Sequence, residues 1–308
     1  MESGDSLVGA GWYQEMAIVP DPGNSNHFYV FSASPVGPDH GFYYSIIDLS
    51  FNGGLGKVVQ KNVQLRNDTI ADCVALVRHG NGRDWWVVVR SWKNVPTNDI
   101  TAYLVSPSGI TATPTQYKGP QVTNASFYRL KFNPQGSRLY NSCQVGAIER
   151  FDFDRCTGLL TKRRIYSTPN GPITGYWDFE ISPDETKLYA VRTMQGVQQN
   201  ISYLMQFEID TATFISSAKY LGTYAEPDRG GALKRGPDGK IYFSIWSAVG
   251  DTCFDYLLCH STSNTTSDNI SVINQPDSVY PACDYQQFSF YLGGHKATQD
   301  YQTTLTMN

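Results

Sequence analysis

The chain has 308 residues and a net charge of −4, with 24 Lys and Arg against 28 Asp and Glu. It has neither a basic surplus nor a dense basic cluster to follow a phosphate backbone, so nucleic acid is not expected as a partner. Hydrophobic residues make up 41% and charged residues only 17%, which excludes disorder for the chain as a whole.

Short strands joined by tight turns follow one another along the chain. Its 20 Tyr and 15 Phe favour strands, and its 27 Gly and 16 Pro favour turns. Gly and Asn accept a positive φ and Pro fixes φ near about −65°, so two strands around a turn of these residues predict a β-hairpin. This pattern occurs in residues 16–34, 74–89, 129–142, 179–191 and 233–245.

The hairpins recur at a regular spacing. Their turn residues Pro20, Gly80, Pro134, Pro183 and Pro237 lie 60, 54, 49 and 54 residues apart, which leaves room for a third and a fourth strand in each interval. No segment keeps the apolar period of an amphipathic helix. The predicted repeat units cover about residues 14–66, 70–120, 125–170, 173–226 and 229–294.

A single four-stranded sheet cannot bury both of its faces, whereas sheets arranged radially cover one another. The sequence therefore predicts an all-β repeat protein, a WD40-like β-propeller of four-stranded antiparallel blades. Five repeat units are readable, and we expect about five to seven blades. They are predicted to form a single domain over residues 1–308.

Seven phrases of the sequence stand in a fixed order between about residues 16 and 298. They are IVPDPGNSNHFYVFSAS, VRHGNGRDWWVV, FNPQGSRLYNS, ISPDETKLYAV, LKRGPDGKIYFSI, SVINQPDS and YLGGHKAT. In this order they resemble the β-propeller module of large secreted proteins of the Bacteroidetes, which often carry PKD domains and a gliding-motility-associated, type IX secretion C-terminal sorting domain. The resemblance implies export to the cell surface and a scaffold or adhesion role, and it supplies no catalytic residues.

Export is expected although the chain itself carries no export signal. Its N-terminus has neither the basic start nor the apolar centre of a signal peptide, and no stretch approaches the ~18 apolar residues that cross a bilayer. From the residues alone, the chain is either cytosolic or has lost its export signal. The resemblance implies a secreted or cell-surface protein that does not insert into the membrane.

The six cysteines, an even number, are compatible with pairing in an oxidising compartment. Cys253 and Cys259 are close enough in sequence to close a loop, and Cys143 and Cys156 are candidates to bridge neighbouring strands. Free thiols are the alternative, because a sequence does not give connectivity.

Catalytic signatures are absent from the sequence, which has no G-x-S-x-G, H-E-x-x-H or Walker motif. A propeller is expected to place a binding site at its central channel, where the innermost strands begin. The residues predicted to line the mouth of this channel are Gln14, Glu15, Asp72, Arg129, Trp177, Asp178 and Arg229.

Two interactions are open to these channel residues. The carboxylates of Glu15, Asp72 and Asp178 could hold Ca²⁺, which prefers several oxygen ligands, or they could pair with Arg129 and Arg229. Large aromatic side chains are expected to pack between blades rather than to stack on sugars, namely Trp85, Trp86, Trp177 and Trp246.

Two functions fit this fold class, because propellers host enzymes and binding modules alike. We expect a non-catalytic, extracellular recognition or scaffold propeller of a secreted multidomain protein, which binds protein or glycan at its loop face and needs no cofactor. The alternative is a metal-dependent hydrolase or lyase of lactonase-like type with its site in the central channel. A divalent ion ringed by carboxylate oxygens would mark the enzyme.

Overall fold

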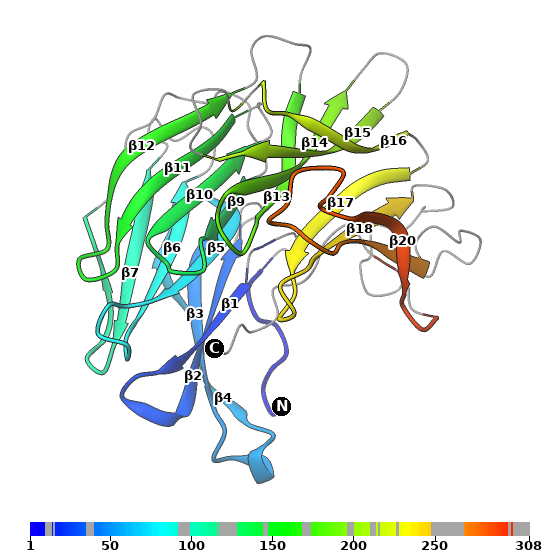
Figure 1. The fold of residues 1–308 in the computed structure, drawn as a ribbon. Helices are drawn as coiled ribbons and strands as arrows, with labels where there is room; N and C mark the ends of the chain where they lie inside the picture. Colours follow the sequence, from blue (N-terminus) through cyan, green and yellow to red (C-terminus); the bar gives the residue numbers. More distant parts are fainter. Residues whose placement is uncertain are drawn as a thin grey trace. The chain divides into compact units, whose positions relative to one another are not determined.

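The computed structural model describes residues 1–9, 14, 16–34, 40–91, 99–114, 116, 128–143, 147–167, 174–195, 200–209, 214, 216–225, 228–247, 268–294 and 297. The chain divides into two compact units. The described residues of unit 1 lie within 1–141 and 150–164, and those of unit 2 lie within 142–149 and 165–301. Both units are built from β-sheets (Figure 1). Among the described residues, no helix is long and apolar enough to cross a membrane.

Unit 1 contains two blades and most of a third, each an antiparallel sheet whose strands pair in chain order. Blade 1 consists of β1 (Met16–Asp21), β2 (Asn24–Ser34), β3 (Gly41–Asp48) and β4 (Lys57–Arg66), with the short 3-10 turn η1 (Asn52–Gly54) before β4. Blade 2 consists of β5 (Ile70–Arg78), β6 (Trp85–Ser91), β7 (Ile100–Ser106) and β8 (Gly109–Ala112). Blade 3 consists of β9 (Tyr128–Phe132), β10 (Arg138–Cys143), β11 (Ala147–Asp154) and β12 (Leu159–Ser167).

Unit 2 contains two further blades of the same kind. Blade 4 consists of β13 (Thr174–Ile181), β14 (Lys187–Gln195), β15 (Asn200–Glu208) and β16 (Lys219–Ala225). Blade 5 consists of β17 (Asp228–Arg235), β18 (Ile241–Ser247), β19 (Asn269–Ile273) and β20 (Tyr285–Tyr291). Five four-stranded antiparallel sheets confirm the predicted all-β, β-propeller fold class.

The hairpin turns adopt the backbone conformations that their residues predict. Gly82, Gly136 and Gly239 have φ values of 75°, 68° and 80° in the turns before β6, β10 and β18. A residue with a Cβ atom is disfavoured in this left-handed region, so the glycines permit the tight reversals.

Three outer strands contain a residue that also has a positive φ, namely Asn62 in β4, Lys162 in β12 and Phe288 in β20. In blades 1 and 5 a serine of the third strand supports it: Ser45 Oγ accepts from Asn62 N at 3.0 Å, and Ser271 Oγ accepts from Phe288 N at 3.1 Å. Such irregularities bend an edge strand and interrupt its regular ladder of main-chain hydrogen bonds.

Blades 1 and 2 bury a common apolar core. The rings of Phe31 and Phe42 stack with their centroids 5.7 Å apart, and Tyr103 of β7 lies 5.3 Å from Phe42. Trp85 packs against this core from its edge. Burial of each such aromatic side chain contributes about 1.5–3 kcal/mol, so the contact between blades is a main source of stability.

Trp86 fills the space between blades 2 and 3. It is 3% exposed, its ring lies 6.2 Å from that of Phe153, and its Nε1 donates to Arg155 O at 2.8 Å. A Cβ atom at Gly158 would lie 2.7 Å from the indole, so only glycine fits beside this ring. The predicted packing of tryptophan between blades is confirmed for Trp86.

Blades 4 and 5 share the core of unit 2, which includes Val191, Phe243 and Ile245. The loop between β19 and β20 extends over blade 4. Tyr189 Oη donates to Pro276 O at 2.8 Å, and Gln206 Nε2 donates to Ser278 O at 2.7 Å. These hydrogen bonds of the loop therefore connect blade 5 to blade 4.

Candidate functional site

Gln14, the first of the predicted channel residues, joins three segments of unit 1. Its main chain bridges β5, because Gln14 N donates to Asp72 O at 3.2 Å and Val74 N donates to Gln14 O at 2.7 Å. Its Nε2 donates to Val74 O at 3.2 Å and to Leu130 O at 2.8 Å, and its Oε1 accepts from Leu130 N at 3.3 Å. The Gln14 amide thus holds the first strands of blades 2 and 3 together.

A buried group of charged side chains surrounds the Cys73 thiol near the start of β5. Asp72 and Arg90 are each 1% exposed, Arg129 is 5% exposed, and Cys73 is fully buried. Burial raises the pKa of Cys73, the charge of Asp72 raises it further, and the charges of Arg90 and Arg129 act in the opposite sense. Two predicted channel residues, Asp72 and Arg129, therefore lie inside unit 1, where buried charges require polar partners.

Arg66 links blade 1 to blade 2 with a further set of polar contacts. Its Nη1 donates to Thr101 Oγ1 at 2.8 Å, its Nη2 donates to Ser91 Oγ at 3.1 Å, and its Nε donates to Asp68 Oδ1 at 2.7 Å. Burial lowers the pKa of Arg66, but the interactions with Asp68 and Tyr103 together outweigh burial and raise the pKa above its usual value. Thr101 and Ser91 belong to β7 and β6, so this guanidinium fixes blade 2 beside the end of β4.

In unit 2, Asp178 connects β13 to β17. The pairing of β13 with β14 shifts register between Tyr176 and Asp178, which places Trp177 in a bulge. Asp178 is 2% exposed; its Oδ1 accepts from Phe179 N and its Oδ2 accepts from Leu233 N, both at 2.8 Å. The carboxylate therefore serves as the acceptor for two main-chain N–H groups in two blades.

Glu180 repeats this arrangement two residues further along β13. Its Oε1 accepts from Ile181 N at 3.0 Å, and its Oε2 accepts from Arg235 N at 3.3 Å. Residues two apart in a strand face the same side, so the two carboxylates Asp178 and Glu180 line one face of β13 toward β17. Glu180 was not among the residues predicted from the sequence, although its alternation with Asp178 is the signal that could have found it.

The remaining predicted channel residues are Trp177, Arg229 and Glu15. Trp177 packs against the core of blades 4 and 5, in agreement with its predicted burial. Arg229 pairs through its main chain with Trp246. The side chains of Arg229 and Trp246, and the whole of Glu15, lie outside the described residues.

The predicted calcium site stays a prediction. Asp72 belongs to unit 1 and Asp178 to unit 2, and Glu15 lies outside the described residues. Within the part of the chain that the structure describes, no three His, Cys, Asp or Glu side chains gather as metal ligands.

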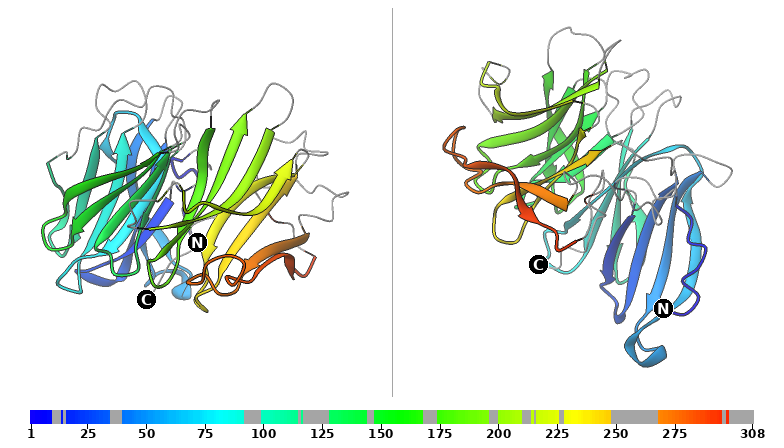
Figure 2. Two further views of the ribbon diagram at one scale, coloured as in Figure 1. Left: turned by 45° about the horizontal axis from the view of Figure 1, so that its top comes forward. Right: turned by 90° about the vertical axis from the view of Figure 1, so that its right-hand side faces the viewer.

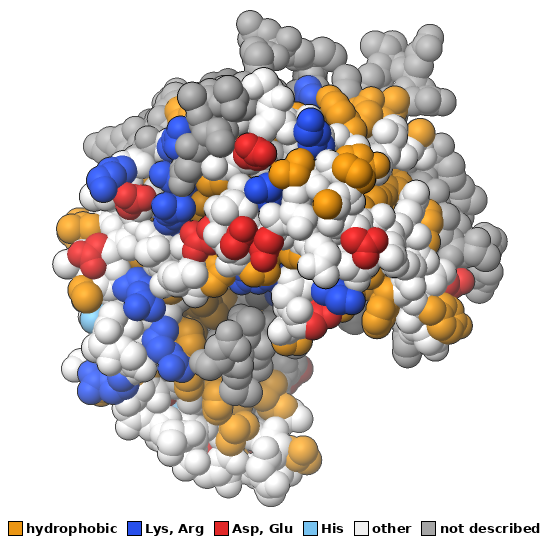
Figure 3. Space-filling model, viewed as in Figure 1, with side chains coloured by type: hydrophobic (Ala, Val, Ile, Leu, Met, Phe, Trp, Pro, Cys, Tyr) orange, Lys and Arg blue, Asp and Glu red, His pale blue; other side chains and the backbone are white. Residues whose placement is uncertain are grey.

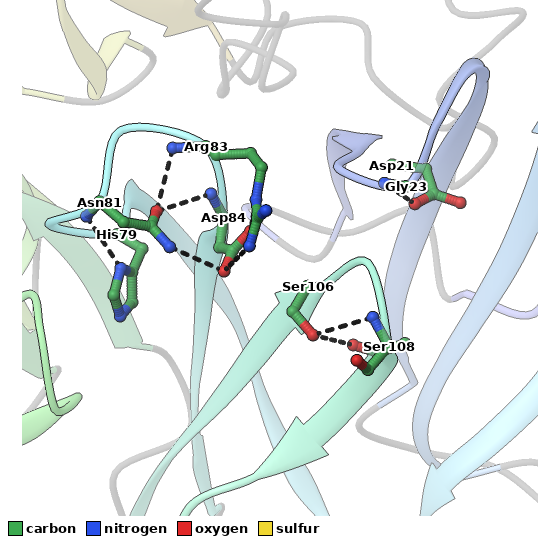
Figure 4. A network of polar contacts seen from close by, with 9 residues as sticks. Asp21, Gly23, His79, Asn81, Arg83, Asp84, Ser106 and Ser108 are labelled. Atoms are coloured by element: carbon green, nitrogen blue, oxygen red, sulfur yellow. Dashed lines mark hydrogen bonds and ion pairs between the residues drawn. The ribbon is translucent and has the colours of Figure 1, made fainter.

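The turn between β5 and β6 is held by hydrogen bonds of its own side chains (Figure 4). Asn81 Oδ1 accepts from Arg83 N and from Asp84 N at 3.0 Å, and Arg83 Nε donates to Asp84 Oδ1 at 2.7 Å. The contact with Arg83 lowers the pKa of the Asp84 carboxyl group. Residues 80–83 of the turn are exposed to solvent, whereas the Asp84 side chain that holds them is buried.

Two further turns lie at the same end of blades 1 and 2. Asp21 Oδ1 accepts from Gly23 N at 2.8 Å, and Ser106 Oγ accepts from Ser108 N at 3.2 Å. A Cβ atom at Gly23 would lie 3.1 Å from Pro107 Cα, so these two turns are in contact. We call residues 21–24, 79–84 and 106–109 the rim turns.

The sequence left a disulfide or free thiols open for Cys143 and Cys156, and the structure decides this for Cys156. It is a free, exposed thiol. Cys143 precedes β11 and Cys156 follows it, and this strand of eight residues spans about 26 Å, whereas bridged Cα atoms lie within about 7 Å. Cys253 and Cys259 lie outside the described residues.

Comparison with known proteins shows similarity of fold. No family model and no curated protein matches the sequence. A putative 6-phosphogluconolactonase from Bacteroides fragilis is similar in structure at 14% identity and a TM-score of 0.48, covering 83% of this chain and 65% of that one. The periplasmic gluconolactonase of Pseudomonas aeruginosa is 13% identical with a TM-score of 0.47, covering 80% and 62%.

The β-propeller domain of Cps50 (Swd1) from Myceliophteria thermophila is 11% identical with a TM-score of 0.42, covering 75% of this chain and 69% of that one. The chain spans less than two thirds of the length of the two lactonase structures. Identities at this level speak to the fold alone, and activity has to be argued from the residues themselves.

Proposed function

We propose that this chain is a non-catalytic recognition or scaffold propeller of an exported, multidomain surface protein. The proposal rests on the hydrogen bonds that the Asp178 carboxylate accepts. Both of its oxygens accept main-chain N–H groups, one of them from the neighbouring blade. A carboxylate that accepts these hydrogen bonds connects two strands and has a structural role. A general base or a metal ligand, by contrast, needs an oxygen that faces the substrate or the ion.

The rim turns support a role in recognition. Their residues 23–24, 80–83 and 107–108 are exposed, and hydrogen bonds within each turn fix their conformation before any partner arrives. Binding to a preformed surface loses less conformational entropy than binding to a flexible loop. Basic and acidic side chains are intermixed on the face shown in Figure 3, which favours a protein or glycan over a polyion of one sign.

The context of the proposal comes from the resemblance to secreted Bacteroidetes modules, whose relatives attach to the cell surface through type IX secretion. We propose the same location and an adhesion role for the protein that contains this chain. In the organism that encodes it, protease added to intact cells should then degrade the chain. Protection until the cells are lysed would contradict the surface location.

The binding test uses a panel of purified polysaccharides and extracellular proteins measured by biolayer interferometry. Ser25 and Ser108 are exposed beside and within the rim turns, so S25R/S108R adds bulk there without touching the core. We expect the variant to lose at least tenfold in affinity for each ligand of the native chain. The matched control T111R adds the same side chain on the outer strand β8 and should bind normally.

An enzyme assay tests the proposal that the chain is non-catalytic. Gluconolactone hydrolysis is followed in the presence of Ca²⁺, Mg²⁺ or Zn²⁺, and we expect the uncatalysed rate with the native chain. Metal-dependent acceleration that disappears in D72N or D178N, with both variants folded by circular dichroism, would overturn the proposal in favour of a hydrolase.

A further inference from the structure

The outer edge of blade 1 is occupied by the chain's own N-terminal segment. Glu2 forms a parallel bridge with Lys57 of β4, in which Glu2 N donates to Gly56 O and Val58 N donates to Glu2 O, both at 3.0 Å. The right-hand view of Figure 2 shows this segment running beside the strands of blade 1. Unpaired N–H and C=O groups of an edge strand are a general template for extended peptides, and here a peptide is bound in cis.

Asn62 binds the main chain of this segment with both ends of its amide. Its Oδ1 accepts from Val8 N at 3.0 Å, and its Nδ2 donates to Ser6 O at 2.9 Å. A donor and an acceptor two residues apart are thereby satisfied by a single side chain, as an adjacent strand would satisfy them. At the comparable positive-φ position of blade 5 the residue is Phe288, so the amide is a special feature of this edge.

Two lysines of β4 face two carboxylates of the segment. Lys57 Nζ lies 2.7 Å from Glu2 Oε1, and Lys61 Nζ lies 3.6 Å from Asp5 Oδ1 and donates to Asp5 O at 2.7 Å. These pairs are largely exposed to solvent and add little affinity, but they select carboxylates spaced three residues apart.

The docked segment is held weakly. Glu2, Ser3, Asp5 and Ser6 are exposed, and Gly4, Leu7 and Val8 are partly covered. Ser3 and Ser6 both have a φ of 57°, a left-handed conformation that is unfavourable for residues other than glycine. Few buried contacts and backbone strain together make local release of such a segment easy.

We infer that the β4 edge of blade 1 is a binding site for an acidic peptide, and that residues 2–8 occupy it as a displaceable strap. The preferred peptide has two carboxylates three residues apart, followed by main-chain groups that the Asn62 amide binds. The site lies on an outer edge and does not depend on the function proposed for the rim turns. It predicts that a segment of this chemistry, carried by a partner protein, competes with the strap.

The test uses the full chain and a fluorescently labelled peptide that corresponds to residues 1–9. E2K/D5K reverses the charges of the strap and leaves the β4 edge intact, so the peptide should bind this variant at least tenfold more tightly than it binds the native chain. Adding N62G should lower that affinity at least tenfold, since glycine keeps the left-handed backbone but removes the amide. Failure of E2K/D5K to bind the peptide at millimolar concentration, or binding that N62G leaves unchanged, would overturn the inference.

A charge-swapped pair provides the matched control. K57E/K61E should reject the native peptide and accept a peptide with lysine at both acidic positions. Hydrogen exchange supplies a readout that does not depend on affinity: the Val58 amide should exchange faster in E2K/D5K than in the native chain and become protected when the peptide is added. An unchanged Val58 amide in every state would show that the strap does not pair with β4.

Discussion

Replacing Asp178 by alanine removes the carboxylate that connects β13 to β17. The side chain is 2% exposed and accepts two main-chain hydrogen bonds at 2.8 Å. A hydrogen bond to a charged group contributes about 1.5–3 kcal/mol, and each buried N–H left without an acceptor costs a similar amount. We therefore expect D178A to lower the free energy of unfolding by about 3–5 kcal/mol, because the N–H groups of Phe179 and Leu233 both lose their partner.

Urea denaturation followed by circular dichroism measures this loss, which corresponds to a shift of about 1–2 M in the midpoint. Hydrogen exchange localises it, since the Leu233 amide should lose protection in D178A. The matched control is E180Q, which keeps an acceptor for one of the two longer bonds of Glu180 and should cost about 1 kcal/mol or less. The structural role of Asp178 would be refuted if D178A lowered the free energy of unfolding by less than about 1 kcal/mol and left the Leu233 amide protected. Asp178 would then again be a candidate catalytic or metal-binding residue.

Three further outcomes follow from the described contacts. Q14A should lower the free energy of unfolding by about 2 kcal/mol in urea denaturation, because the Gln14 amide makes three hydrogen bonds to the first strands of blades 2 and 3. The lowered pKa of Asp84 contributes stability above its unfolded pKa of about 4 that is lost as the pH falls, so R83A should reduce the difference in stability between pH 7 and pH 3; an unchanged pH profile would contradict this. G136A should be more destabilising than G82A in the same denaturation assay. Both glycines have a positive φ, which costs alanine about 1–2 kcal/mol, but only at Gly136 would the new Cβ atom lie 2.3 Å from another side chain.

Local chemistry made the fold class predictable. Gly82, Gly136 and Gly239 occupy hairpin turns at positive φ, as the Asn-Gly, Gln-Gly and Asp-Gly pairs of the sequence indicate. Alternating apolar residues on either side of each turn then specify antiparallel strands, and their repetition indicates blades. The sequence left open whether Cys143 and Cys156 form a disulfide, because proximity in sequence does not account for the strand that separates the two residues.

The strands, the turns and the class of sheet could therefore be predicted from the residues alone, since these features depend on the conformational preferences of neighbouring residues. The roles of the polar residues depend on contacts between distant parts of the chain. Asp178 meets Leu233 across 55 residues of chain, and Gln14 meets Leu130 across 116. No spacing in the sequence marks such pairs, because they form only when the twist and register of two sheets bring a carboxylate or an amide against a main-chain group of another strand.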